Sequence, residues 1–281
     1  MNNLITAEGF AKTFRYIKLI EQGLAVTVLL ALFTVIIGFV LGILLAIMRM
    51  TDVRPFRFLA YGKNGRIRSS RLLIAVSKFN PISFFATAYV EILRSTPVLV
   101  QVMIIYHGIF GKLIDLPNFT LFGFLKFNRF FPGVVALGMN SGAYLCEIIR
   151  SGIQSIDGGQ TEAARSLGMT RNQTLFHIIL PQAIKNILPA IANEFVTIIK
   201  ESSICYTIGV QEIMYAVNSV KGATFSIAEP LVVATCVYFC LTFPTSKIIA
   251  HFERKMSVGD KRNGAEAINK KHERKAKMTK V

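Results

Sequence analysis

The sequence predicts an all-α polytopic membrane protein with about five transmembrane helices. Its 281 residues are 52% hydrophobic, and their mean hydropathy of +0.49 exceeds that of ordinary soluble domains. From Leu24 to Met48 the chain carries 25 consecutive uncharged residues, which as a helix exceed the roughly 30 Å hydrocarbon core of a bilayer. Because the alternating pattern of a membrane barrel is absent from the sequence, helices are the expected form.

Five apolar stretches mark the expected spans, at about residues 24–48, 86–109, 131–150, 186–208 and 230–250, within one transmembrane domain at 24–254. The first stretch is longer than the apolar core of about 7–15 residues in a cleaved signal peptide, so we expect it to be retained. Residues 1–23 precede it as an outer segment. There Phe10, Phe14 and Ile17 fall on one helical face, which favours a short helix in the membrane interface; a frayed terminus is the alternative.

Lysine and arginine are unevenly distributed along the chain. Residues 49–78, 150–185 and 247–281 hold 23 of them, against seven in the segments that would face the other side. Because cytoplasmic loops carry the excess of positive charge, we expect the N-terminus outside the cell and the C-terminus in the cytoplasm. The basic loop 51–80 is assigned no role. The basic tail 255–281 is expected to be solvated near anionic inner-leaflet lipid.

The net charge of +16 raises nucleic acid as a partner. The topology explains the same charge, so we expect no nucleic-acid partner. A basic membrane anchor that binds nucleic acid through Lys270–Lys280 is the alternative, and it predicts salt-sensitive binding by that peptide.

A membrane-embedded enzyme is a second alternative, with intramembrane Glu, Lys and His residues as the catalytic groups. Against it, the histidines are scattered and form no pattern of metal ligands or of nucleophile and base: His107, His177, His251 and His272. The cysteines lie in apolar surroundings and are expected to be small core residues: Cys146, Cys205, Cys236 and Cys240. The sequence also lacks a Gly-Lys-Ser/Thr phosphate-binding loop, so this chain is not expected to be an ATPase.

The polar stretch between the third and fourth spans, residues 155–181, is predicted to form two short helices on the cytoplasmic side. Gly168 suits the left-handed conformation that ends the first helix, and Thr170 with Gln173 matches a capping box that opens the second. Pro181 is expected to limit the second helix. Such a rigid pair, with the acid Glu162 on a basic protein surface, suits the transmission of force from a partner.

This loop also carries a specific motif. Its fixed positions are Glu162, Ala163, Ala164, Gly168, Ile178, Leu180 and Pro181. In residue types, in spacing and in its place before the penultimate span, the segment resembles the complete EAA motif of membrane permease subunits of ABC importers.

Further segments resemble permeases for polar amino acids of the histidine, glutamine, arginine and glutamate type. They are residues 91–101 entering the second span, 140–153 in the third and 188–203 in the fourth. Together the resemblance covers about residues 23–50 and 84–254. The loop 51–80 and the extended tail depart from it.

The resemblance implies a type I importer fold in a bacterial cell membrane, in which two permease chains, identical or homologous, surround one pathway. It also implies two ATPase subunits docked in the cytoplasm and an external amino acid-binding protein. The chain would be a transporter subunit rather than an enzyme and would bind no cofactor, since ATP and Mg²⁺ belong to the ATPase. The segment Glu162 to Gly168 would be the coupling helix that drives alternating access. The identity of the amino acid and of the second permease chain stays open.

Polar residues at membrane depth are costly and are therefore candidates for functional sites. In the fourth span Asn193, Thr197 and Lys200 recur on one face. Glu194 and Lys200 have the charges to bind the ammonium and carboxylate of an amino acid, with pairing between permease chains as the alternative.

Two further groups lie in the second and third spans. Asn140, Ser141 and Tyr144 suit either the substrate pathway or close helix packing. Glu91, Arg94 and Gln101 form a gating or structural group, in which Glu91 is expected to pair with Arg94.

The loop at residues 112–129 is rich in phenylalanine. Such a loop either rests on the membrane surface or contacts an external partner, and the sequence leaves both interpretations open.

Overall fold

The computed structural model describes residues 5–56 and 76–278, with side chains up to residue 255. The basic loop 51–80 and the tail 255–281 therefore lie largely outside the described side chains. Helices dominate the described residues, which hold one hairpin of two-residue strands and several irregular connections, and this confirms the all-α prediction. Two compact units are present: residues 1–151 with 197–238, and residues 152–196 with 239–281.

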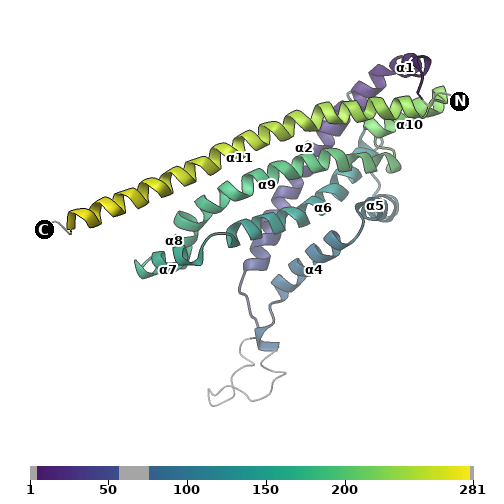
Figure 1. Ribbon diagram of the computed structural model, residues 1–281. Helices are drawn as coiled ribbons and strands as arrows, with labels where there is room; N and C mark the ends of the chain where they lie inside the picture. The colour runs from purple at the N-terminus through teal and green to yellow at the C-terminus, as the bar shows by residue number, and fades with distance from the viewer. Residues whose placement is uncertain (1–4, 57–75, 279–281) are drawn as a thin grey trace. The chain divides into compact units, whose positions relative to one another are not determined.

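The first unit contains most of the elements drawn in Figure 1. They are α1 (Ala7–Phe14), α2 (Ile17–Met50), α4 (Pro81–Ser95), α5 (Val98–Met103), the π-helix η2 (Ile104–Phe110), β1 (Thr120–Leu121), β2 (Leu125–Lys126), most of α6 (Phe127–Gln154), the 3₁₀-helix η4 (Ser202–Ile208), α10 (Ile213–Thr224) and the start of α11 (Ala228–Met278). The strands pair antiparallel, with Thr120 opposite Lys126.

The core of the first unit lies where α2, α5, α6 and η4 meet. Its buried side chains include Val26, Leu30, Val102, Leu137 and Ile208. Helices α2 and α6 approach closely at two glycines. A Cβ at Gly38 would stand 2.8 Å from Ser141 Oγ, and one at Gly42 would stand 2.8 Å from Leu145 Cβ. Small residues at these positions allow the close approach that packs membrane helices.

The second unit contains the end of α6, then α7 (Gly158–Ser166), α8 (Arg171–Thr174), the π-helix η3 (Leu175–Ile179), most of α9 (Leu180–Glu201) and the later part of α11. Figure 1 shows α7 turned back against α8, and α7 also contacts η3. These short helices occupy the predicted loop 155–181.

Within the part of the chain that the structure describes, three helical runs are long and apolar enough to cross a membrane: Ile17–Met50, Arg171–Ile208 and Ala228–Lys255. The pair Pro81–Ser95 and Val98–Phe110 meets the same test together but bends by 110° between its parts. The second predicted span is therefore broken rather than continuous. The third lies within α6, which has 28 residues. At about 1.5 Å per residue α6 is long enough to span, although its mean hydropathy is lower.

The N-terminal segment is helical, and the frayed-terminus alternative is wrong. Thr6 caps α1 by accepting a hydrogen bond from the Gly9 N–H, and Glu229 accepts from the Thr6 N–H at 3.0 Å. Ile17 does not belong to this helix, because the chain breaks at Arg15 and Tyr16 before α2 begins. The helix of the first span therefore starts earlier than residue 24.

The cysteines divide into two pairs. Cys146 and Cys205 are buried, as the sequence predicted, whereas Cys236 and Cys240 are exposed on α11. The prediction that all four are core residues is wrong for the second pair. Apolar neighbours in the sequence do not distinguish the core of a membrane protein from its lipid-facing surface, because both are apolar.

Candidate functional site

Helix α7, which carries the EAA residues, is fixed at both ends by local hydrogen bonds. At its start the Asp157 carboxylate accepts from the Gly159 N–H at 2.7 Å. At its end the Met169 N–H donates to the Ala164 oxygen and the Gly168 N–H to the Arg165 oxygen, while Gly168 takes a φ of +86°. This is a Schellman motif with glycine in the left-handed position. The predicted helix end at Gly168 is confirmed.

The second predicted helix begins as expected. Thr170 accepts from the Gln173 N–H, and the Thr170 N–H donates to Gln173 Oε1 at 2.8 Å, so the predicted capping box is confirmed.

Pro181, however, does not end this helical run. The chain passes from α8 through η3 into α9 without a break, and Pro181 is the second residue of α9. A proline removes one hydrogen bond and crowds the carbonyl four residues earlier. The π-helical turn at residues 175–179 widens the helix at this point, which lets the chain continue.

The residues of the EAA motif divide between buried or half-buried positions and exposed ones. Ala164 is buried, and Ile178 and Leu180 are half-buried. Glu162, Ala163, Gly168 and Pro181 are exposed.

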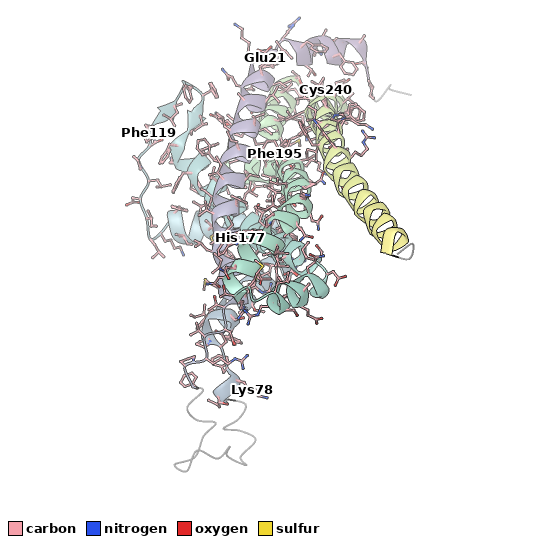
Figure 2. All side chains as sticks on the ribbon, turned by 90° about the vertical axis from the view of Figure 1, so that its left-hand side faces the viewer. Glu21, Lys78, Phe119, His177, Phe195 and Cys240 are labelled. Carbon is pink, nitrogen blue, oxygen red and sulfur yellow. The ribbon has the colours of Figure 1, made fainter. Side chains whose placement is uncertain are left out.

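Two large apolar side chains that the sequence did not single out also face outward here. Leu167 is 85% exposed at the end of α7, and Phe176 is exposed on η3, next to the labelled His177 of Figure 2. Helix α7 thus presents a rigid surface with an acid and an apolar tip. Such a combination is typical of a docking site.

The start of α9 is packed against the end of α6. A Cβ at Gly152 would stand 2.3 Å from Ile187 Cγ1, and Asn186 donates a hydrogen bond to Ser155 at 3.0 Å. These contacts lie on either side of the α7–η3 turn in the chain. They hold together the two ends of the segment that carries α7, α8 and η3.

The break between α4 and α5 is built around Pro97. Pro97 has no N–H to donate to the oxygen of Leu93, and residues before proline avoid the helical region. Two side chains replace the missing bond. Gln101 Nε2 donates to the Leu93 oxygen at 2.8 Å, and Asn140 Nδ2 donates to the same oxygen at 3.3 Å and to Gln101 Oε1 at 2.9 Å. Gln101 and Asn140 therefore stabilise the broken span, and a pathway role for Asn140 stays a prediction.

The other polar residues of the second and third spans are separated by the fold. Ser141 is buried against Gly38, which fits the packing alternative. No ion pair joins Glu91 to Arg94 among the described residues, so the predicted pairing is wrong. The Arg94 guanidinium lies 5.5 Å from the centre of the Tyr144 ring instead, a cation–π contact from α4 to α6.

An ion cluster joins α2 and α6 at one end. Glu147 accepts from Arg49 Nη1 at 2.8 Å and also pairs with Arg150. All three side chains are largely shielded from solvent, which makes such pairs stronger and their loss more costly.

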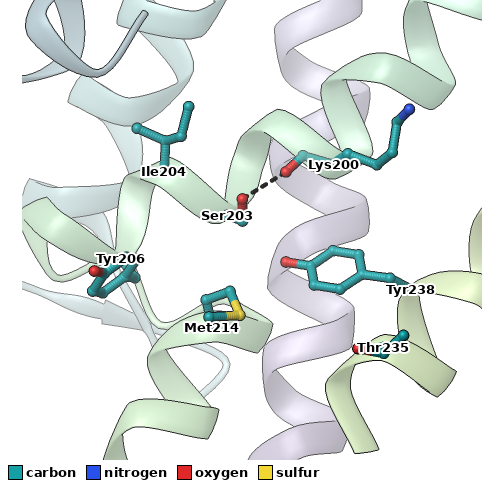
Figure 3. Close-up of a pocket in the computed structure, with 7 residues that line it drawn as sticks. All are labelled: Lys200, Ser203, Ile204, Tyr206, Met214, Thr235 and Tyr238. Carbon is teal, nitrogen blue, oxygen red and sulfur yellow. Dashed lines mark hydrogen bonds between the residues drawn. The ribbon is translucent and has the colours of Figure 1, made fainter. Parts of the chain in front are cut away.

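A cavity of about 410 Å³ opens between the end of α9, η4, α10 and α11 (Figure 3). Its lining is Lys200, Ser203, Ile204, Tyr206, Met214, Thr235 and Tyr238. The Ser203 hydroxyl donates to the Lys200 oxygen at 2.7 Å. The lining thus combines one lysine and several hydroxyl-bearing residues with apolar side chains, a composition that suits a small polar ligand.

Glu212 forms hydrogen bonds with two of the residues that line the cavity. Its buried carboxylate accepts hydrogen bonds from the N–H groups of Met214 and Tyr215 and from the Tyr238 hydroxyl at 3.0 Å. Met214 and Tyr238, which line the cavity, are therefore held by one carboxylate.

Comparison with known families shows which family the chain belongs to. Residues 72–258 match the family described as the binding-protein-dependent transport system inner membrane component. The chain belongs to this family. It is a membrane-embedded permease subunit of a transport system and not the ATPase itself.

Curated relatives match most of the permease. It is similar to the arginine transport system permease protein ArtQ of Bacillus subtilis (strain 168), at 36% identity over 89% of this chain and 98% of the relative. It is also similar to the putative glutamine transport system permease protein GlnP of Rickettsia conorii, at 34% over 89% and 99%. The nopaline transport system permease protein NocM of Agrobacterium fabrum is 35% identical over 79% and 81%.

Solved structures give the same fold. A chain from the crystal structure of an amino acid ABC transporter with histidines superposes with a TM-score of 0.72 at 36% identity, covering 88% of the permease and 98% of that chain. A chain of the MetNI methionine ABC transporter, at 17% identity and a TM-score of 0.55, shares the fold. The permease therefore has the type I importer fold.

The predicted pathway residues are mostly not residues of the permease cavity. Of the six, Lys200 is the one among the residues that line it. Sequence reasoning missed Tyr206, Met214 and Tyr238. These come from three separate elements, so no local spacing connects them.

Proposed function

We propose that this chain is the permease subunit of an ATP-driven importer of polar amino acids. The single observation that carries the proposal is the exposed, doubly capped helix α7 with the EAA residues, in a chain whose relatives are named for arginine, glutamine and nopaline transport. The names of the relatives give the substrate class. The geometry of α7 gives the means of coupling.

Helix α7 docks on a separate ATPase subunit. Leu167 enters an apolar site on that partner, and Glu162 pairs with a basic group at its edge. ATP and Mg²⁺ are held by the ATPase, and this chain binds no cofactor. Two ATPases, an identical or homologous second permease chain and an external binding protein complete the assembly.

The membrane orientation follows from the charge distribution. Segments that hold 23 of the lysines and arginines include the α7 loop and the C-terminal tail. We place them in the cytoplasm of a bacterial cell and the N-terminus outside.

The cavity of Figure 3 receives the amino acid during transport. Its volume of about 410 Å³ lies within the roughly 300–1,000 Å³ of small-molecule sites. Lys200 binds the substrate carboxylate, and the hydroxyls of Tyr206 and Thr235 bind its polar groups.

The test is ATP-dependent uptake of radiolabelled amino acids by proteoliposomes that contain the whole transporter and its binding protein. We expect uptake of one polar amino acid. We expect Lys200→Gln to raise the KM for uptake by about tenfold, the loss of one hydrogen bond to a charged group. Lys18→Gln, at an exposed lysine far from the cavity in the chain, serves as the control. ATP-independent uptake would refute the proposed function, and an unchanged KM in Lys200→Gln would refute the substrate site alone.

A further inference from the structure

The hairpin formed by β1 and β2 has a strained and exposed tip. Phe122 takes a φ of +54° and Gly123 a φ of +76°, so both turn residues are left-handed. Hairpins of this kind favour asparagine and glycine, because the left-handed conformation costs a residue with a Cβ roughly 1–2 kcal/mol. Nevertheless phenylalanine stands here, and its side chain is 78% exposed. The Phe122 ring lies 6.4 Å from the ring of Phe124, between centres, and this contact leaves most of the side chain uncovered.

The rest of the hairpin is firmly anchored. Leu125 is buried in the core of the first unit with residues of α2 and α6. Phe119 stacks on Phe127 at 4.7 Å between ring centres, and Phe127 stacks on Phe131 at 5.4 Å. Figure 2 shows this segment, labelled at Phe119, and Phe124 lies beside the α2 residues Lys18 and Glu21. The anchor holds Phe122 outward at a fixed place.

Exposed apolar side chains recur between the broken span and the tip. The hairpin follows the bent pair that ends at Phe110, and exposed apolar side chains lead along the chain from Ile104 through Leu113, which is 79% exposed, to Leu121. Lys112 and Lys126 flank them and are exposed. Aromatic and aliphatic side chains beside lysines are typical of the boundary between headgroups and acyl chains.

We propose that the hairpin tip inserts into the lipid interface, with Phe122, Leu113 and Leu121 among acyl chains and Lys112 and Lys126 at lipid phosphates. The contact fixes the end of the broken span at one membrane depth. A soluble protein partner is the other candidate occupant. The position of the hairpin directly after the broken span in the chain, and the lysines beside its exposed apolar side chains, favour lipid over that partner.

The permease contains no tryptophan, so a single introduced tryptophan reports its own surroundings. The experiment uses the full chain in liposomes of phosphatidylcholine and phosphatidylglycerol, with and without brominated acyl chains. We expect brominated lipid to reduce the emission of Phe122→Trp about twofold, since interfacial side chains reach about 5–10 Å into the boundary. Leu113→Trp is the second probe, at an unstrained position of the same surface, should the first variant misfold. Leu167→Trp on α7 is the control and is expected to be quenched by aqueous acrylamide only.

The proposal is overturned if Phe122→Trp and Leu113→Trp are insensitive to brominated lipid and are quenched by acrylamide as strongly as Leu167→Trp. It is also overturned if their emission changes only when a soluble substrate-binding protein is added. The measurement needs no ATPase and no transport, so its outcome is independent of the proposed function.

Discussion

The Asn140 side chain donates a hydrogen bond to Gln101 Oε1 at 2.9 Å, and both amide groups donate to the main-chain oxygen of Leu93. This oxygen lies four residues before Pro97 and would be unpaired without them. The pair therefore links a sequence-imposed break in the second span to the third helix. It also explains how a membrane protein tolerates irregular backbone at this depth.

Replacing Gln101 is expected to destabilise the permease. Gln101→Met keeps the approximate shape but leaves the Leu93 oxygen and the Asn140 amide short of partners. We expect the free energy of unfolding in detergent to fall by about 1–3 kcal/mol. Gln22→Met, at an exposed glutamine of α2, should change it by less than about 0.5 kcal/mol. Because Gln101 and Asn140 share one acceptor, Gln101→Met with Asn140→Leu should cost less than the sum of the single variants. Strict additivity would contradict the shared role.

The left-handed conformation of Gly168 predicts that a side chain at this position strains the backbone and lowers stability, even where it meets no neighbouring atom. A Cβ at Gly168 meets nothing within 4 Å, yet φ is +86°. We expect Gly168→Ala to destabilise the α7 segment by about 1 kcal/mol. Gly158→Ala is the matched control, since a Cβ there also meets nothing and the backbone is not left-handed. Hydrogen exchange of the α7 amides measures the effect, and equal exchange in both variants would argue against the Schellman end.

At Phe225 a substitution is expected to raise the free energy of unfolding, the opposite of the effect at Gly168. It ends α10 with a φ of +55° and is 90% exposed, while its N–H donates to the Lys221 oxygen. Glycine fits this position without strain, so Phe225→Gly should raise the free energy of unfolding by about 1 kcal/mol. Phe252→Gly, the same exchange at an exposed position inside α11, should lower it by about as much. Thermal unfolding in detergent compares the two, and a loss of stability in Phe225→Gly would show that this side chain makes a contact in the membrane.

Glu212 predicts a dependence of stability on pH. It lies between η4 and α10, outside the candidate spans, and burial raises the pKa of its carboxyl from 4.5 to about 7 despite the hydrogen bonds to the ionised form. The folded state therefore holds the proton more tightly than the unfolded state. This contribution to stability is complete below about pH 4.5 and is lost as the pH rises through about 7. Glu212→Gln keeps an acceptor but does not titrate.

The melting temperature of the wild type, minus that of Glu212→Gln, should thus fall between about pH 5 and pH 8. A difference that stays constant over this range would mean that Glu212 does not change its protonation there.

Local features of the fold were predictable where a few neighbouring residues decide them. The left-handed Gly168 and the capping box of Thr170 and Gln173 depend on contacts within five residues, and both are as expected. Pro97 was visible in the sequence, but its consequence depends on Gln101 and Asn140, and Asn140 comes from another helix. Pro181 shows the reverse case, because a widened turn in η3 absorbs it.

The cavity was harder to foresee, since Lys200, Met214 and Tyr238 meet only through tertiary packing. The polar face of a single helix can predict at most the residues that this helix contributes to the cavity lining. The strand pairing of the hairpin was equally hidden, because Phe122 stands where asparagine would signal the turn.

Co-purification of the ATPase with the detergent-solubilised permease tests the central claim, that α7 is the coupling helix, most directly. Two variants change the α7 surface, Glu162→Lys and Leu167→Asp. Their matched controls make the same kinds of change at exposed residues in connecting segments outside α7: Asp115→Lys and Ile227→Asp. We predict that wild type and both controls retain the ATPase, and that both α7 variants lose it or hydrolyse ATP without transport. Normal binding and coupling in the α7 variants, or loss in the controls alone, would contradict the assignment of α7.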